Sequence, residues 1–487
     1  METQTAVSSF AVESGDISSK FDDDGRKKRT GTLMTASAHI ITAVIGSGVL
    51  ALSWALAQLG WIAGIIALLI FSLITLLTCI LLTDCYRSPD PITGRRNYNY
   101  MEAVKNNLGG IKYKLCAVSQ YSNLVGISIG YTITAAISMA AVKRSNCFHK
   151  NGHEAGCHTS NSSYMIILGA IEIILSQIPN FHELAGLSFI ASVMSFTYSL
   201  IGIGLSIAKI AERKNGSTSI AGVTVGVDVT RSQKVFNSLQ ALGNIALAYF
   251  FSNVLIEIQA SQSLNIQSFY DTLKSSPPEN LVMKKASVIG VSITSVFYLL
   301  CGGLGYAAFG NLAPGNFLTG FGFYEPYWLV NIANICIVVH LVGAYQLFSQ
   351  PVYQLVEDWC KRRRPESDFI VKEHQIVIPF VGNFNINFFR CIWRTVYVIF
   401  TTVIAMLFPV FNSVLGLIGA ASFWPLTVYF PIEMYISQAK IRSFSLKWFG
   451  LKTLSWVCFI VTIVAAVASI RGIIIDLGHY KPFKSVS

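Results

Sequence analysis

Long apolar runs, divided by short polar segments, set the pattern of this chain. A helix that crosses a bilayer needs about 20 mostly apolar residues, and windows of that length find eleven candidates. They lie near 32–58, 60–83, 115–142, 164–179, 186–208, 235–258, 286–307, 328–350, 391–409, 411–436 and 453–470. The fourth and fifth are divided only by the polar cluster at 179–183, which is short enough to be a tight turn. The pattern predicts an all-α polytopic membrane protein.

Composition supports this fold class. Of the 487 residues, 53% are hydrophobic and 13% are charged, and the mean hydropathy is +0.53, which is more apolar than ordinary soluble proteins. The formal charge of +11 does not indicate a nucleic-acid partner, because the basic residues lie in short segments between apolar runs. Residues 1–30 are polar and lack the apolar core of a signal peptide. We expect them to form a disordered tail that is retained.

The basic residues also predict the orientation of the helices. With the N-terminus inside the cell, the inner segments carry most of the 36 Lys and Arg residues, in agreement with the positive-inside rule. Eleven helices then place the C-terminus outside.

The predicted outer segments contain both glycosylation motifs and a pair of cysteines. The two N-x-S/T motifs begin at Asn161 and Asn215. We expect Cys147 and Cys157 to form a disulfide, because an outer loop is oxidising. The same cysteines, with His149, His153 and His158, could instead form a zinc site, but no C-x-x-C spacing is present. We therefore favour the disulfide.

Gly46, Ser47 and Gly48 interrupt the middle of the first apolar run. In hydrocarbon every backbone polar group needs a partner, so irregular backbone persists only where protein or a water-filled cavity surrounds it. A broken helix exposes N–H groups that suit a substrate carboxylate and carbonyl groups that suit an ammonium. The alternative is that these small residues only let two helices pack closely.

A second break in a corresponding helix would favour the binding hypothesis, because transporters with inverted repeats break one helix in each half. If helices one to five are repeated by six to ten, the partner is helix six. It carries Gly243 and Asn244 early, and Tyr249, Ser252 and Asn253 midway. We expect Tyr249 and Asn253 to reach the substrate, the alternative being hydrogen bonds between packed helices. Tyr131 and Tyr345 are further candidates for the pocket wall.

Ionisable residues at membrane depth are costly and are functional candidates. The predicted spans contain His39, Glu172, Glu257, His340 and Arg394. The pKa of an unperturbed imidazole is about 6.5, so His39 and His340 are our candidates for carrying a coupled proton. Each could instead be a neutral histidine bonded to a backbone carbonyl. Glu257 is expected at the inner interface, and Glu172 could bond a neighbouring helix.

Several long blocks occur in order from about residue 30 to the C-terminus. They include “TASAHIITAVIGSGVLALSWALAQLGWIAG”, “LLTDCYRSPDPITGRRNYNYMEAV”, “GYAAFGNLAPGNFLTGFGFYEP” and “HLVGAYQLFSQPVYQLVE”. These blocks resemble the plant amino acid permeases of the amino acid/auxin permease superfamily. The resemblance implies proton-coupled uptake of a broad range of amino acids at the plasma membrane. It also implies a leucine-transporter-like core of five plus five inverted helices, with an eleventh added.

On this basis the chain divides into three parts. They are a cytosolic tail at 1–30, a ten-helix core at 31–436 with repeats at about 31–208 and 235–436, and an eleventh helix with an extracellular tail at 437–487. One segment departs from the family pattern. Eleven residues, 260–270, separate Gln259 from Asp271. We expect this insertion to be tolerated as a loop, because lengthening a flexible loop costs little. The alternative is that it extends or displaces the inner end of helix six, so that the inner gate does not close.

Other functions remain as alternatives. The chain has no Walker loop and no HExxH motif, so we expect neither an enzyme nor a cofactor or resident metal. A receptor could use the same site to sense amino acids without transporting them. Sodium could replace the proton, because sodium sites use carbonyls and hydroxyls around a broken helix.

Overall fold

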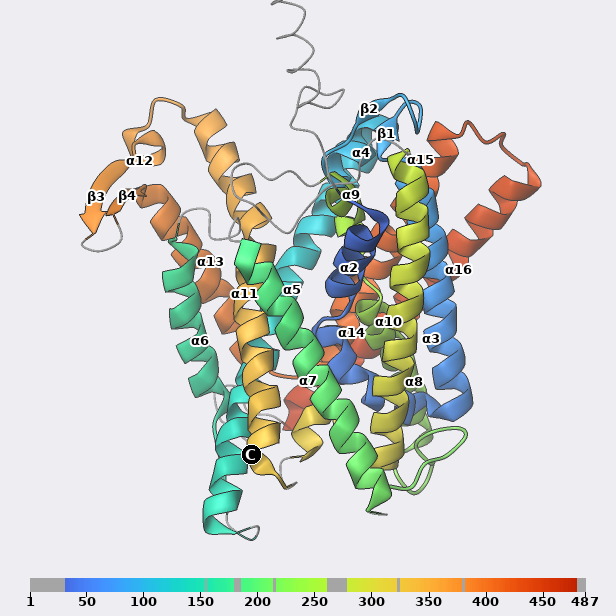
Figure 1. Ribbon diagram of the computed structural model, residues 1–487, viewed down its shortest axis with the longest axis vertical. Helices are drawn as coiled ribbons and strands as arrows, with labels where there is room; N and C mark the ends of the chain where they lie inside the picture. The colour runs from blue at the N-terminus through green and yellow to red at the C-terminus, as the bar shows by residue number, and fades with distance from the viewer. Residues whose placement is uncertain are drawn as a thin grey trace, which may run out of the picture.

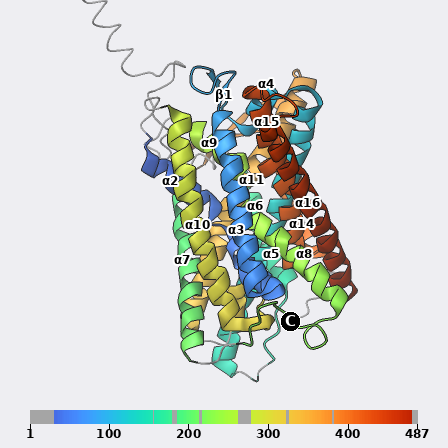
Figure 2. The same cartoon turned by 90° about the vertical axis from the view of Figure 1, so that its right-hand side faces the viewer.

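The computed structural model describes residues 31–152, 154, 156–178, 185–212, 216–260, 278–321, 325–378 and 382–479. These residues form a bundle of long helices that run roughly side by side (Figures 1 and 2). The polar tail at 1–30, the turn at 179–183, His153, Asn215 and all of the insertion except Ala260 lie outside the described residues.

The first half of the bundle begins with a helix that is interrupted after Val44 and a second helix that bends at Gly60. Helix α2 (Leu33–Val44) is followed by a short 3-10 turn, η1 (Ser47–Ala51), and by α3 (Leu52–Asp84). Gly60 bends α3 sharply, with φ of 82° and ψ of 177°. A Cβ at this position would lie 2.2 Å from the backbone nitrogen of Gly222, so the bend needs glycine both for its dihedral angles and for the close approach.

The remaining helices of the first half are α5 (Gly110–Asn151), α6 (Asn161–Ser176) and α7 (Ala185–Ala211). The second half contains α8 (Arg231–Ala248), α9 (Ser252–Ala260), α10 (Glu279–Phe309), α11 (Tyr327–Arg363) and α13 (Phe388–Leu407). Its last helix joins α14 (Phe411–Ser422), a π-helical segment η5 (Phe423–Tyr429) and α15 (Phe430–Gln438). Helix α16 (Leu446–His479) follows.

Within the described residues, nine helices are long and apolar enough to cross a membrane, and α6 is a shorter apolar helix. The parts of α3 before and after Gly60 count as two spans rather than one, and α6 adds another. Together these give the eleven predicted spans. Large apolar side chains such as Leu73, Ile174 and Ile460 are exposed on the bundle, as expected of a surface that faces lipid rather than water. The predicted all-α polytopic fold is confirmed.

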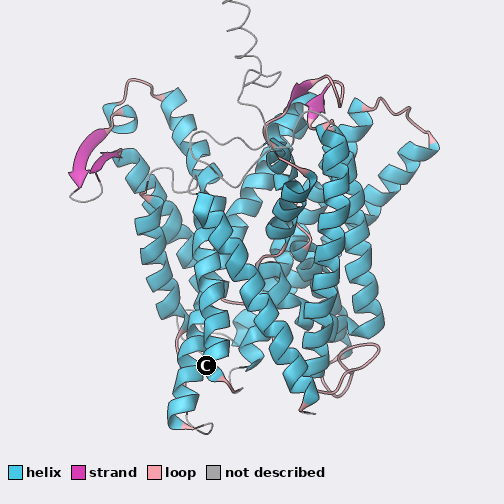
Figure 3. Cartoon of the chain, in the orientation of Figure 1, coloured by secondary structure: helices cyan, strands magenta, loops and turns pink. Residues whose placement is uncertain are grey.

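Two small hairpins and several short helices connect the spans (Figure 3). Strands β1 (Arg87–Ser88) and β2 (Arg95–Arg96) pair next to α4 (Tyr100–Asn107). Helix α12 (Asp368–Val371) precedes the paired strands β3 (His374–Ile378) and β4 (Gly382–Ile386). All of these lie at one end of the bundle, at the top of Figure 1, which we call the α4 side. The short turns η3 (Gly310–Leu312) and η4 (Phe317–Phe321) follow α10.

We call the opposite end the disulfide side, because the Cys147–Cys157 bond lies there at the end of α5. At this end the segment 216–230 is hydrogen-bonded to neighbouring helices. The backbone N–H of Val223 donates to the Ala57 carbonyl at 2.9 Å, and that of Trp61 donates to the Ser219 carbonyl. The Lys234 ammonium donates to the Gln58 carbonyl at 2.6 Å. These bonds tie the bend at Gly60 to the start of α8 and close this end of the bundle.

Candidate substrate-binding site

The break in the first span lies where the glycines predict it. Helix α2 ends at Val44, Ile45 and Gly46 are extended (Gly46 has φ of −135°), and η1 starts at Ser47. The last carbonyls of α2 and the first N–H groups of η1 therefore have no helical partners. The break therefore presents backbone donors and acceptors that are not used within a helix.

The two glycines of the break have different roles, and neither has a positive φ. A Cβ at Gly46 would meet no atom within 4 Å, whereas a Cβ at Gly48 would lie 2.8 Å from Ala248 Cα. Gly46 keeps space open, and Gly48 lets η1 pack directly on the end of α8. The close-packing interpretation thus applies to Gly48, while substrate binding at the tripeptide stays a prediction.

The second break lies in helix six. Helix α8 ends at Ala248, and α9 starts at Ser252, so Tyr249, Phe250 and Phe251 connect two half-helices. Gly243, which the sequence suggested as part of the break, instead lies within α8. There a Cβ would be 2.4 Å from the Gly416 carbonyl oxygen of α14, so this glycine serves helix packing.

The two breaks border a cavity of about 260 Å³. Residues of α5, α7, α9, α11 and α14 complete its wall, and its lining continues from the breaks to His39 on α2 and to Ile258 on α9. Among the described residues that line it, none is Asp, Glu, Lys or Arg. The described lining also contains polar side chains, among them Ser47 and Asn253.

The structure brings most of the predicted site residues to this cavity. Its lining includes Gly46, Ser47, Gly48, Asn253, His39, His340 and Tyr131. Tyr131 packs edge-on against Phe348, another lining residue, with ring centroids 5.7 Å apart.

Two predicted tyrosines lie elsewhere. Tyr249, the first residue of the second break, is fully buried. Its ring packs edge-on against Tyr298 of α10, with ring centroids 5.3 Å apart. Tyr345 of α11 bonds through its hydroxyl to Thr401 of α13 at 2.7 Å. Neither lines the cavity, because the side of a helix that faces a pocket depends on how the helix is rotated against its neighbours.

The two histidines approach the cavity from different helices. His39 is half-buried on α2, about two turns before the break. His340 of α11 is 8% exposed, and its Nδ1 lies 2.8 Å from the Ala191 carbonyl oxygen of α7. If Nδ1 carries the proton and donates to this carbonyl, Nε2 is left as an acceptor.

Glu172 and Arg394 have partners outside the cavity. Glu172 of α6 is 5% exposed, and its carboxylate accepts from the Gln346 side chain at 2.6 Å. Arg394 of α13 pairs with Glu357 at 2.9 Å and donates to the Ser176 carbonyl. Glu257 lies in α9, and its side chain is outside the described part of the structure.

Tyr298 is the residue at this site that the sequence did not reveal. Its hydroxyl contacts the Val44 and Ala248 carbonyl oxygens, which end the two broken helices. In the sequence it is one of two tyrosines in the same apolar run, and no local signal distinguishes it from Tyr306 two turns later.

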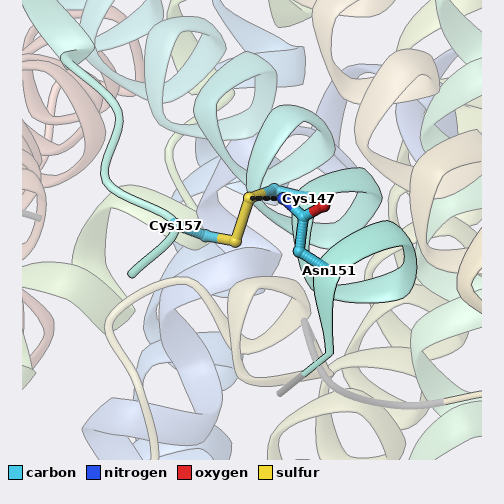
Figure 4. The surroundings of a disulfide bond; sticks show 3 residues. All are labelled: Cys147, Asn151 and Cys157. Atoms are coloured by element: carbon cyan, nitrogen blue, oxygen red, sulfur yellow. Dashed lines mark hydrogen bonds between the residues drawn. A yellow bond between two sulfur atoms is a disulfide. The ribbon is translucent and has the colours of Figure 1, made fainter. Parts of the chain in front are cut away.

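The disulfide joins Cys147, in the last turns of α5, to Cys157, which follows the helix. Cys147 and Cys157 are joined with an S–S distance of 2.04 Å, and Asn151 donates to the Cys147 sulfur (Figure 4). Asn161 is the first residue of α6 and is half-buried.

Comparison with known proteins identifies the family. The model of the family “Transmembrane amino acid transporter protein” matches residues 29–475. The chain belongs to this family. It is 61% identical to Amino acid permease 6 of Arabidopsis thaliana over 97% of this chain and 96% of that one. It is 59% identical to Amino acid permease 1 of the same plant over 99% and 97%.

The expected resemblance to plant amino acid permeases is thus confirmed, and the chain is an amino acid transporter rather than an enzyme. A solved structure with a similar fold is that of MhsT in complex with L-phenylalanine. It has a TM-score of 0.51 and 11% identity, and the match covers 91% of this chain and 100% of that one. At this identity the likeness concerns the fold alone.

Proposed function

We propose that this chain is a proton-coupled symporter that imports a broad range of amino acids across the plasma membrane by alternating access. The observation that carries the proposal is the cavity between two chain breaks, which has exposed backbone groups of both polarities and no charged side chain among its described lining residues. Such a site recognises the part that all α-amino acids share. MhsT, which has a similar fold, holds L-phenylalanine in its solved structure.

The substrate carboxylate would bind the N–H groups of Ser47 and Gly48 at the start of η1, where the partial positive charge of a helix N-terminus is located. The ammonium would bind the carbonyls that end α2 and α8. Asn253, in the first turn of α9, offers an amide to either group. The side chain of the substrate would then extend toward the rings of Tyr131, Phe250 and Phe348. These rings form a largely apolar surface that suits side chains of many shapes.

The coupled proton is assigned to His39 and His340. Both line the cavity, so a proton on either imidazole would be within reach of the substrate's charges. Protonation from an acidic exterior would precede substrate entry, and loss of the proton to the cytosol would favour release. Glu172, paired with the neutral Gln346, is the alternative carrier.

The proposed orientation has the α4 side and the N-terminus in the cytosol and the C-terminus outside. The positive-inside rule supports it, as do the positions of Cys147, Cys157, Asn161 and Asn215 in segments that this orientation places outside. From the breaks the cavity lining continues along α9, which packs against α4, while on the disulfide side hydrogen bonds join the Gly60 bend to the start of α8. The structure would then correspond to a state that releases substrate to the cytosol. The proposed repeats at about 31–208 and 235–436 each contain one broken helix.

Concentrative uptake of a labelled amino acid by cells that express the full chain tests this function. We expect accumulation that rises as the external pH falls and that collapses when a protonophore is added. Replacing external sodium by choline at fixed pH separates proton coupling from sodium coupling. Binding of the amino acid without accumulation would instead favour the receptor function.

A further inference from the structure

Tyr298 occupies a position where two helix ends meet. Its hydroxyl oxygen lies 2.5 Å from the Val44 carbonyl oxygen and 3.0 Å from that of Ala248. Val44 is the last residue of α2 and Ala248 the last residue of α8. One side chain of α10 therefore joins both broken helices at the points where their hydrogen-bonding ladders stop.

The surroundings of this hydroxyl fix its position. Tyr298 is fully buried, and its ring is held edge-on by Tyr249. Val44 and Ala248 line the cavity, whereas Tyr298 does not. The hydroxyl thus bonds the two carbonyls from a residue outside the cavity lining, and a substrate ammonium in the cavity would lie beside the two residues that carry them.

A tyrosine hydroxyl has one proton and can donate fully to one carbonyl at a time. Two carbonyl oxygens at helix C-termini both carry partial negative charge, and in a dry interior each needs a donor. With one donor for two acceptors, one carbonyl remains available. A substrate ammonium, which has three donors, would supply the missing bond.

In transporters with broken helices, carbonyls at the ends of half-helices commonly coordinate the coupling ion. Here the hydroxyl of Tyr298 lies between two such carbonyls. We propose that Tyr298 is a positioning residue that takes the place of a cation at this point and holds the two breaks in register for substrate binding. The proposal rests on the proposed function only in assuming that the cavity binds an amino acid.

The test removes the hydroxyl and keeps the ring. Binding of a labelled neutral amino acid is measured with full-length protein that has been purified as a monodisperse species, so that only folded molecules are counted. We expect Tyr298→Phe to weaken binding by about tenfold. This is the effect expected when a hydrogen bond is lost that positions the carbonyl groups to which a charged ligand binds. Tyr345→Phe is the matched control, because its hydroxyl bonds to Thr401 outside the cavity, and we expect less than a twofold change.

Sodium provides a second readout that needs no variant. If the hydroxyl replaces a cation, binding by the unmodified protein will be the same in sodium and in choline medium. A requirement for sodium would overturn the proposal, as would equal affinities of Tyr298→Phe and Tyr345→Phe. If the unmodified chain binds the amino acid but cells do not accumulate it, the symport function fails while the role of Tyr298 is still decided by these affinities.

Discussion

At the scale of single residues, Gly46 and Gly48 illustrate how one motif serves two purposes. An added Cβ meets nothing within 4 Å at Gly46 and meets Ala248 Cα at 2.8 Å at Gly48. Gly46→Val should therefore fold normally and lose substrate affinity, because its side chain enters the cavity. Gly48→Ala should destabilise the fold by about 1–3 kcal/mol, the usual cost of overpacking.

Thermal unfolding of the purified variants and uptake at matched surface abundance separate these effects. Gly204→Val is the control, because a Cβ at Gly204 also meets no atom within 4 Å and the residue lies outside the cavity. Normal uptake by Gly46→Val at normal abundance would show that the substrate does not occupy the space beside the first break.

The histidines are also tested residue by residue. His39→Ala or His340→Ala should abolish proton-driven accumulation or flatten its dependence on external pH, because the carrier of the coupled proton is lost. His149→Ala is the control, since His149 stacks on Tyr327 on the disulfide side with 48% of its side chain exposed. Uptake against pH is measured for all three variants. Unchanged curves for both His39→Ala and His340→Ala would direct attention to Glu172 and Glu257.

At the scale of elements, a buried ion pair anchors the β1–β2 hairpin to the start of α10. Arg87 and Arg96 both contact the Glu279 carboxylate at 2.8 Å, and all three side chains are at most 5% exposed. Glu279→Gln would remove the carboxylate that both buried guanidinium groups share. We expect a loss of about 3–5 kcal/mol in the free energy of unfolding.

Glu433→Gln is the comparison for this prediction. Glu433 pairs with Lys112 and Lys452, whose side chains are 36% and 27% exposed, so water can solvate the lysines when the carboxylate is gone. Chemical or thermal unfolding in detergent should rank Glu279→Gln as clearly less stable. Equal stabilities of the two variants would mean that the hairpin's arginines find other partners.

At the scale of the whole molecule, the orientation in the membrane is the main prediction. If the disulfide side is extracellular, the protein made in a eukaryotic cell should carry sugar at Asn161, and glycosidase treatment should increase its mobility in electrophoresis. Asn161→Gln should remove that part of the shift, and Asn215→Gln any remainder. A tag at the N-terminus that is accessible to antibody on intact cells would reverse the proposed orientation.

The sequence by itself determined the elements that depend on local chemistry. Hydropathy reports the cost of placing each residue in lipid, so the number and approximate limits of the spans followed from it. The first break was also predictable, because Gly46-Ser47-Gly48 is a strong local signal in a hydrophobic run. The second break is marked in the sequence only by aromatic residues. Gly243, which the sequence suggested as part of it, lies within α8 instead.

Only the tertiary structure decided which side chains meet. Tyr131 faces the cavity and Tyr249 and Tyr345 do not, although all three are tyrosines within apolar helices. The hydroxyl of Tyr298 joins Val44 and Ala248, which are far apart in the sequence. The physical reason is that rotation and tilt of a helix in lipid are set by packing against its neighbours, so contacts between helices cannot be derived from any one helix alone.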